Sequence, residues 1–207
     1  MYKILTLLIS LIPVQSLKVL FYNLIGIDID KKCKIGFLVC ISSKKAIFKN
    51  TSIESLNFIF ANDIFVNDCK IMKANYFNNI SKLEFNKSFI GNFNKFISDK
   101  KHQKKNNNLI IKSTQILNRN LFDISSDIFL EDAKISNFNQ FWTHGFDVFR
   151  KINLGDIEIR NNVVINNNVI ILPGVKLNNK IIIHHGCIVH KNLIEPGEYK
   201  SNLICKL

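Results

Sequence analysis

The 207-residue sequence predicts an all-β fold, a parallel β-helix in which short strands stack as a solenoid. Two observations predict it. Apolar residues recur at every sixth position from Ile29 to Phe89, and at 47% apolar content a run of eleven has a chance on the order of two in ten thousand. Most of these residues are β-branched or aromatic, which favours strands. The row consists of Ile29, Ile35, Ile41, Ile47, Ile53, Ile59, Phe65, Ile71, Phe77, Leu83 and Phe89.

A second array of hexads occupies the C-terminal part of the chain. Its two inward residues are separated by one outward residue, as in a short strand, and the Asn, Gly or Asp residues that follow supply a turn. One strand cannot bury its apolar side alone, so successive coils must stack into a continuous core. The two rows are Ile157, Val163, Val169, Val175, Ile181, Cys187, Leu193 and Ile159, Ile165, Ile171, Leu177, Ile183, Val189.

The two arrays are out of register, because the step from Phe89 to Ile159 is not a multiple of six. Two segments can hold the additional residues. Gly91–Asn108 ends in eleven residues without an apolar side chain, and we expect a loop extruded over about residues 91–109. Phe138–Gly155 holds the single tryptophan of the chain.

The N-terminal residues 1–26 are expected to be helical, with an amphipathic half at Ser16–Leu24 that caps the fold or rests on a membrane surface. The apolar run Ile4–Val14 imitates a signal peptide, but no small-x-small cleavage site follows. Pro13 and Gln15 also stop the run short of the ~20 residues of a membrane span. We therefore expect a helical segment, a β-helix domain over residues 27–194, and a C-terminal tail over 195–207.

The charge balance and the cysteines narrow the class of protein. Lys and Arg total 28 against 16 Asp and Glu, a net charge of +12 that suits an anionic partner. Only three of the basic residues are arginines, the residue preferred for base and phosphate recognition, so nucleic acid is not expected as a partner.

The five cysteines form neither C-x-x-C pairs nor an even framework, which favours a reduced, cytoplasmic compartment.

Two stretches resemble a known family. Val163–Leu177, continued by Ile181–Lys191, is similar to the C-terminal coils of the hexapeptide-repeat acyltransferases, which are left-handed parallel β-helix enzymes. Ile171-Leu-Pro-Gly-Val175 has the same five letters that this family often has, and Glu195-Pro-Gly-Glu-Tyr199 resembles its exit from the helix.

Two further motifs resemble one branch of that family, the enzymes that O-acetylate bacterial surface polysaccharides. They are Asn120-Leu-Phe-Asp-Ile124 and Gln140-Phe-Trp-Thr-His-Gly-Phe-Asp147. The resemblance implies a left-handed coil of three hexads per turn and a homotrimer with sites between neighbouring subunits. It also implies transfer of an acetyl group from acetyl-CoA to a sugar hydroxyl, without a metal.

His144 matches the catalytic histidine of the family. A hydroxyl is a poor nucleophile at neutral pH, and imidazole, with a reference pKa of about 6.5, can accept its proton. Asp147 is a candidate to orient the imidazole or hold the acceptor. Trp142 and Thr143 are candidates for binding the substrate, where Trp142 would stack on a sugar ring or on the pantetheine arm. A turn aspartate and a packing indole remain equally open for Asp147 and Trp142.

The family holds the pantetheine arm with backbone N–H groups at coil corners and the phosphates with lysines. Asn and His stand at some corners where the family has small residues, which leaves open a shifted or degraded acetyl-CoA site. The residues that match the cofactor positions are Asn167, Gly174, His185, Gly186, Lys191 and Lys206.

The histidines His184, His185 and His190 do not predict a metal site. His184 and His190 are one hexad apart and are expected to face outward from different sides of the solenoid, so they would not converge on one ion.

Three functions stay open beside O-acetylation at this point. The first is N-acetylation of an amino sugar or a nucleotide-linked sugar. The second is a non-catalytic β-helix scaffold that has lost CoA binding. The third, binding of nucleic acid through net charge alone, predicts a steep dependence on salt.

Overall fold

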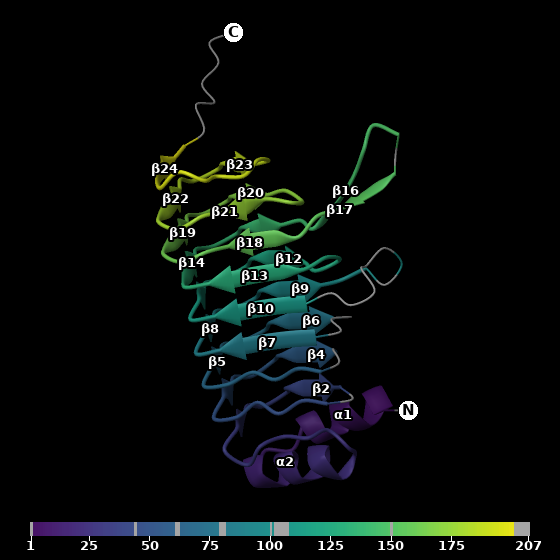
Figure 1. Cartoon of the computed structure of the whole chain (residues 1–207). Coiled ribbons are helices and arrows are strands. Elements are labelled where there is room, and N and C mark those ends of the chain that lie inside the picture. Colours follow the sequence, from purple (N-terminus) through teal and green to yellow (C-terminus); the bar gives the residue numbers. More distant parts are fainter. Residues whose placement is uncertain are drawn as a thin grey trace.

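The computed structural model describes residues 2–43, 45–60, 63–78, 82–99, 101, 108–149 and 151–200, and it shows a parallel β-helix with a helical cap at its N-terminal end (Figure 1). Each strand of the coils pairs in parallel with the strand one coil further along; for example, Ile35 pairs with Ile53 and Ile53 with Ile71. In the described residues the strands form three parallel sheets of nine, eight and five strands.

The nine-stranded sheet consists of β1 (Lys34–Ile35), β3 (Ser52–Ile53), β5 (Lys70–Ile71), β8 (Phe89–Ile90), β11 (Gln115–Ile116), β14 (Ala133–Ile135), β19 (Val163–Ile165), β22 (Ile181–Ile183) and β24 (Gly197–Tyr199). The eight-stranded sheet consists of β2 (Cys40–Ser42), β4 (Phe58–Phe60), β6 (Tyr76–Asn78), β9 (Lys95–Ile97), β12 (Leu121–Asp123), β15 (Gln140–Phe141), β20 (Ile170–Ile171) and β23 (Ile188–Val189). The five-stranded sheet consists of β7 (Lys82–Asn86), β10 (Asn108–Lys112), β13 (Ile128–Glu131), β18 (Ile157–Ile159) and β21 (Lys176–Leu177).

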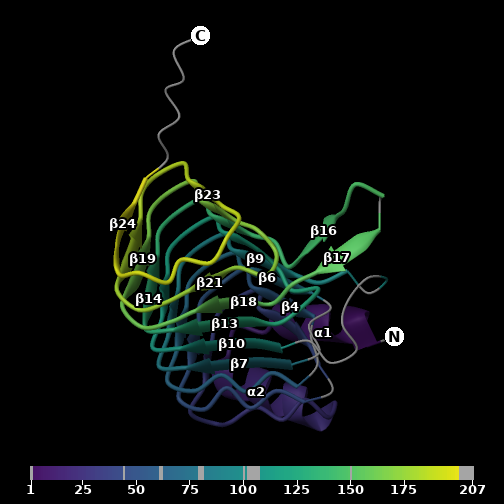
Figure 2. The ribbon, with the colours of Figure 1, turned by 45° about the horizontal axis from the view of Figure 1, so that its top comes forward.

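The coil is left-handed. In Figure 1 the strands β10 and β13 lie in front and run toward the left edge, where the nine-stranded sheet lies, and the chain returns along the back through the eight-stranded sheet. Figure 2 shows the same course, clockwise as the coils advance toward the viewer. The expected hand is therefore confirmed, although most parallel crossovers in proteins are right-handed.

The core is one continuous apolar column. Both C-terminal rows of the sequence point inward as predicted, and Ile29, Ile35 and Ile41 are buried. The middle of the column is a stack of four phenylalanines, whose ring centroids lie 4.6, 4.7 and 4.4 Å apart and whose planes are within 5° of parallel. The stack consists of Phe77, Phe96, Phe122 and Phe141.

Among the residues of the N-terminal row whose burial the structure describes, which leaves out Leu83, the prediction is wrong at Ile47, Phe65 and Phe89, which are only half-buried. Their neighbours Phe48, Val66 and Ile90 point inward instead. The reason is the corner that leads into the nine-stranded sheet, which is one residue shorter in these coils than in the C-terminal ones. Phe48 precedes Ile53 by five positions and Phe85 precedes Ile90 by five, whereas Ile159 precedes Ile165 by six.

Both predicted segments hold the additional residues that shift the register. Corresponding positions of successive coils have a sequence separation of 26 between Asn94 and Asn120 and of 30 between Asn139 and Val169, against 18 in a regular coil. Strand β9 lies within the segment of about 91–109 that was expected to loop out, so the departure from the coil starts after Ile97. Other coils contain a single additional residue, with a separation of 19.

One edge of the prism is built from asparagines. We call it the Asn corner, and it lies where the chain passes from the nine-stranded to the eight-stranded sheet. Buried side-chain oxygens each accept the backbone N–H of the next coil at 2.8 or 2.9 Å, in a ladder through Asn57, Asn75, Asn94, Asn120 and Asn139 to Val169. A second ladder of half-buried side chains runs beside it through Asn92, Asn118, Asn137 and Asn167.

The N-terminal segment forms two helices, α1 (Tyr2–Ser10) and α2 (Gln15–Leu24), rather than the single helix expected. Pro13 lies between them, and a helix does not continue through it because proline has no backbone N–H to donate. Tyr22 is fully buried and its hydroxyl donates to the carbonyl of Val39 at 2.7 Å, so α2 closes the end of the apolar column. Among the described residues, none of the helices is long and apolar enough to span a bilayer.

At the other end, the expected C-terminal tail contributes a strand. Ile181, Ile182 and Ile183 of β22 pair with Gly197, Glu198 and Tyr199 of β24, so the β-helix continues beyond residue 194. Leu193 also bridges to Leu177. The remainder of the tail, residues 201–207, lies outside the described residues.

Candidate active site

The candidate site lies on a second edge of the prism, where the chain passes from the eight-stranded to the five-stranded sheet. We call it the hairpin corner, because β16 (His144–Phe146) and β17 (Ile152–Leu154) leave the coil here as an antiparallel hairpin (Figure 2). Trp142 still belongs to the coil and donates its backbone N–H to the carbonyl of Ile171 at 2.9 Å. His144 follows two positions later and is the first residue of the projecting hairpin.

The imidazole of His144 is held by Asp123, which ends β12 one coil below. Nδ1 of His144 lies 2.7 Å from Oδ2 of Asp123. The His144 side chain is 23% exposed and that of Asp123 only 3% exposed. The pair therefore joins a buried carboxylate to an imidazole that reaches the surface.

Asp123 is fixed by the backbone and side chains around it. Its Oδ2 accepts the N–H groups of Thr143 and His144 at 3.0 and 3.1 Å, and its Oδ1 accepts the hydroxyl of Ser125 at 2.7 Å. The Thr143 hydroxyl lies 2.9 Å from the Asp123 carbonyl and 3.1 Å from Oδ2, and it accepts the N–H of Ser126 at 2.9 Å. A buried carboxylate with this many donors has one orientation, and it imposes one orientation on the imidazole.

This geometry sets the tautomer of His144. A carboxylate only accepts hydrogen bonds, so Nδ1 carries the hydrogen and donates it, which leaves the lone pair of the neutral ring on Nε2. In the part of the chain that the structure describes, Nε2 makes no hydrogen bond. An imidazole with Nδ1 anchored to a buried carboxylate and Nε2 open is the arrangement of a general base.

The hairpin is locked to the coil by a close glycine contact. The Gly155 N–H donates to the Thr143 carbonyl at 2.9 Å and closes the base of the hairpin. A Cβ on Gly155 would lie 2.4 Å from the backbone nitrogen of Gly174, so no larger residue fits there. Gly174 itself has a φ of +81°, which favours glycine. Gly145 is roomier, because a Cβ there would meet only the Pro173 ring at 3.7 Å.

Two aromatic rings flank the imidazole. Trp142 and Phe146 lie with ring centroids 6.2 and 6.5 Å from His144, both nearly perpendicular to it. The Trp142 indole is half-buried and donates to the Gln140 side chain at 3.1 Å, while Phe146 is 69% exposed. Apolar ring surface is thus available beside the imidazole, of the kind on which sugar rings and acyl chains pack.

The structure corrects two of the predicted site residues. Asp147 does not reach His144, because its carboxylate turns back to accept the N–H groups of Phe149 and Lys151, both at 2.8 Å, at the hairpin turn. Thr143 is fully buried and is engaged with Asp123 and Ser126, so it supports the site from behind and does not face a substrate.

Asp123 is the residue that the sequence analysis missed in this role. Its signal was present, because it is the fourth residue of the motif Asn120–Ile124 that resembles the polysaccharide-modifying branch. The role depends on the register between coils, which the motif does not show. Asp123 and His144 are distant in sequence, and only the stacking of coils that pairs Phe122 with Phe141 brings the two side chains together.

The predicted cofactor residues separate onto two edges of the prism. Gly174 is at the hairpin corner, and Lys191 is at the same corner one coil further on, because Val189 pairs with Ile171 and Leu193 with Leu177. Asn167, His185 and Gly186 are instead at the Asn corner, and Lys206 lies outside the described residues.

Asn167 and His185 are engaged in the Asn corner itself. The Asn167 side-chain oxygen accepts the Asn137 N–H at 2.9 Å, and Nδ1 of His185 accepts the Asn167 N–H at 3.3 Å, which extends the ladder. His184 pairs with Glu198 at 2.9 Å on the adjoining sheet face. Among the described residues, no group of three or more His, Cys, Asp or Glu side chains could hold a metal ion.

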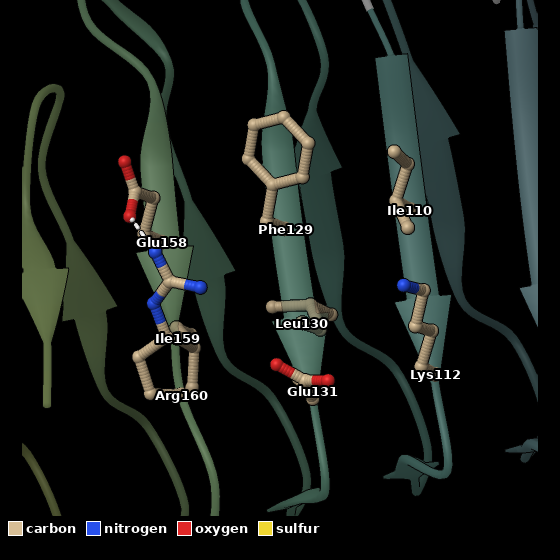
Figure 3. A pocket seen from close by; sticks show the side chains of 8 residues that line it. All are labelled: Ile110, Lys112, Phe129, Leu130, Glu131, Glu158, Ile159 and Arg160. Atoms are coloured by element: carbon tan, nitrogen blue, oxygen red, sulfur yellow. Dashed lines mark hydrogen bonds and ion pairs between the residues drawn. The ribbon is translucent and has the colours of Figure 1, made fainter. Parts of the chain in front are cut away.

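A shallow hollow of about 370 Å³ lies apart from this site, on the outer face of the five-stranded sheet (Figure 3). Its floor is apolar, with Ile110 and Phe129 side by side. Glu158 at its rim bonds to Arg160 and Lys176, both at 2.7 Å, and the Lys176 hydrogen bond, more than the charge of either cation, lowers the pKa of Glu158. None of the predicted catalytic residues lines it.

No family model and no curated protein matches the sequence. Solved structures do. A hexapeptide-repeat acetyltransferase from Vibrio cholerae O1 biovar eltor, in complex with acetyl coenzyme A, is similar at 13% identity over 98% of this chain and 81% of that chain, with a TM-score of 0.43. The polysialic acid O-acetyltransferase OatWY is similar at 15% identity over 86% of this chain and 81% of its own, with a TM-score of 0.45.

The polysialic-acid-specific acetyltransferase NeuO is similar at 16% identity over 86% of this chain and 84% of its own, with a TM-score of 0.35. All three solved structures are acetyltransferases, and the first is described as a hexapeptide-repeat protein, the family that the sequence resembles.

Proposed function

We propose that the protein is an acetyl-CoA-dependent O-acetyltransferase that modifies a hydroxyl of a bacterial surface glycan or of its precursor. The observation that supports it is the Asp123–His144 pair, with a 2.7 Å contact from a buried carboxylate to Nδ1 and with Nε2 open on a projecting hairpin. This is the geometry that general-base activation of a hydroxyl requires.

In the proposed reaction Nε2 of His144 accepts the proton of the acceptor hydroxyl while its oxygen forms a bond to the thioester carbonyl carbon. Asp123 stabilises the imidazolium that results and does not itself take the proton. As the carbonyl re-forms, the carbon–sulfur bond breaks, and Nε2 returns its proton to the departing CoA sulfur. Atoms and charge balance without an acyl-enzyme or a metal, and the buried cysteines have no role.

The donor is proposed to lie along the hairpin corner. Gly174 leaves open space where a side chain would project, since a Cβ built there meets nothing within 4 Å, and Lys191 is exposed one coil further on. Trp142 and Phe146 would provide the ring surface beside the reacting hydroxyl. Asn167 and His185 are not proposed as donor ligands, because the Asn corner already engages them.

We also propose a homotrimer in the cytoplasm, where acetyl-CoA would be available. The hairpin turn exposes Val148 and Phe149 at 90% and 79%, and a neighbouring copy packed against this turn would close the open side of His144. Sedimentation of a Val148→Glu/Phe149→Glu variant tests this; a monomeric variant from a trimeric parent supports it, and an unchanged mass contradicts it.

The test of the function is His144→Gln, with His184→Gln as the matched control. Release of CoA thiol is followed with acetyl-CoA and bacterial surface glycans, polysialic acid among them. We expect His144→Gln to lower turnover by about 10²- to 10⁴-fold without a change in melting temperature, and His184→Gln to have little effect. Near-native turnover in His144→Gln contradicts the base assignment.

The scaffold alternative is favoured by one observation, the occupation of the Asn corner by Asn167 and His185 where the family has small residues. Titration with CoA decides it, because a protein that binds no CoA at millimolar concentration is not the proposed enzyme. Treatment of the product with mild base separates O- from N-acetylation, since esters are cleaved and amides survive.

A further inference from the structure

The N-terminal cap presents an apolar surface that the described part of the chain leaves uncovered. Both helices contribute to it at the same end of the prism (Figure 1). Their exposed fractions run from 41% to 70%, and the residues are Ile4, Leu5, Leu7, Leu8, Leu11, Val14, Leu17, Leu20, Phe21 and Leu24. Single exposed apolar residues are normal on a protein surface, but ten of them on two short helices and the turn between them mark an interaction site.

The inner faces of the helices already account for the stability of the cap. Ile9, Val19 and Tyr22 are buried against the first coil, and Lys18 turns inward to donate to the carbonyl of Gly36. The exposed residues are therefore not needed to close the β-helix. Exposing them has a cost in solubility that a partner surface would remove.

The charge around this surface selects the partner. Residues 1–50 contain eight lysines and two aspartates, a net +6, which is half of the +12 of the whole chain in a quarter of its length. Helices α1 and α2 contain no acidic residue. Lys31, Lys32 and Lys34 are exposed beside α2, and Lys31 lines a hollow of about 700 Å³ together with Val14, Val19 and Leu20.

We propose that this cap docks the protein on the surface of a bilayer that contains anionic lipid. The apolar side chains of α1 and α2 would enter the boundary between head groups and acyl chains, and the lysines of the first coil would lie among the phosphates. A second copy of the chain is the less favourable occupant, because two such surfaces would bring their positive charges together. The docking is independent of the catalytic proposal. It would hold the N-terminal end of the prism at the membrane, with the long axis of the β-helix pointing away from the membrane surface.

The test is co-sedimentation of the full chain with mixed vesicles of phosphatidylcholine and phosphatidylglycerol, the anionic lipid making up roughly a third. We expect binding at 0.1 M salt, weaker binding at 0.5 M salt, and weaker binding to phosphatidylcholine alone. Leu8→Gln/Leu20→Gln is expected to lower the partition coefficient at least about tenfold, since both side chains leave an apolar environment. Ile188→Gln/Ile194→Gln is the matched control, with two equally exposed residues in the last coils.

The charge contribution is measured separately. Lys31→Gln/Lys34→Gln is expected to weaken binding to the anionic vesicles by about fivefold per lysine, and Lys95→Gln/Lys134→Gln, which removes the same charge from the sides of the prism, much less. Unchanged circular dichroism shows that each variant folds. Absence of sedimentation with anionic vesicles, equal binding of the Leu and Ile variants, or an oligomer that Leu8→Gln/Leu20→Gln dissociates would each overturn the proposal.

Discussion

The Asn corner and the hairpin corner are two edges of the same prism, and they use the same backbone in opposite ways. At the Asn corner each coil repeats the one below. The buried side-chain oxygens of successive asparagines, beginning with Asn57, accept the backbone N–H groups of the turns. At the hairpin corner the repeat is interrupted by the additional residues of the hairpin, and a carboxylate and an imidazole meet there. The regular edge supplies rigidity, and the interrupted edge carries the candidate active site.

The difference follows from what each turn must satisfy. A repeated corner uses its side chains to bind the backbone N–H groups of neighbouring coils, so these side chains are turned to the prism itself and not to a substrate. The hairpin leaves the coil and needs its base fixed, and Asp123 does this by accepting the N–H groups of Thr143 and His144. The same carboxylate then orients the imidazole, which is how a structural turn becomes a candidate active site.

The largest expected effect is at the centre of the interrupted edge. Asp123→Asn replaces an acceptor-only group with an amide that can hold the wrong imidazole tautomer, and we expect turnover to fall about 10²- to 10⁴-fold with an altered pH profile. Asp147→Asn is the control and should keep turnover within a few-fold, because the Asp147 carboxylate accepts N–H groups of the hairpin turn and, within the described residues, does not bond to His144. The assignment fails if the two variants lose activity to the same extent.

A pair of glycine variants compares the two edges directly. A Cβ at Gly155 would lie 2.4 Å from the Gly174 nitrogen, and one at Gly91, on the Asn corner, 2.4 Å from the Leu117 carbonyl oxygen. We expect Gly155→Ala and Gly91→Ala each to lower the free energy of unfolding by about 3 kcal/mol in urea titrations. Turnover of the folded protein should fall only for Gly155→Ala; a fall in Gly91→Ala would mean that the two edges are coupled.

Within the Asn corner the ladder is expected to be unequal. The Asn120 side-chain amide donates to Asn94 and to the Ser136 carbonyl at 3.1 and 2.8 Å, whereas the buried Asn139 amide has no partner among the described residues. Asn120→Ala should therefore cost about 2 kcal/mol of unfolding free energy and Asn139→Ala about 1 kcal/mol. Equal costs would show that the ladder acts as one unit.

The smallest expected effect concerns the ionisation of a buried thiol in the regular coils. Burial raises the pKa of the Cys33 thiol to about 11, above the reference of about 8.5. The folded state thus favours the neutral thiol, so its contribution is complete below about pH 8.5 and is lost as pH rises toward 11. As pH rises from about 8 to about 9.5, the free energy of unfolding should fall by about 1 kcal/mol less in Cys33→Ala than in the parent protein, as measured by urea titration. An identical loss would indicate a thiol open to solvent.

The sequence predicted the fold because the fold is periodic. Both C-terminal rows point inward, since a six-residue period with alternation inside it has few other ways to bury its apolar side. The first row failed at Ile47, Phe65 and Phe89, where the step across the corner into the nine-stranded sheet is five residues, against six in the C-terminal coils. Such a one-residue change leaves no mark in an apolar pattern whose neighbouring positions are apolar too.

The site was only partly predictable for a related reason. His144 was identified through its motif, and the hairpin corner does carry it. Asp123 was not, and Asp147 was chosen instead, because Asp147 is close to the histidine in sequence and Asp123 belongs to the coil below. The chain by itself determined the stacked coils, since hydrophobic burial acts through local period. Tertiary structure alone decided which carboxylate meets the imidazole, because that depends on how many residues each coil contains and on the pairing of Phe122 with Phe141.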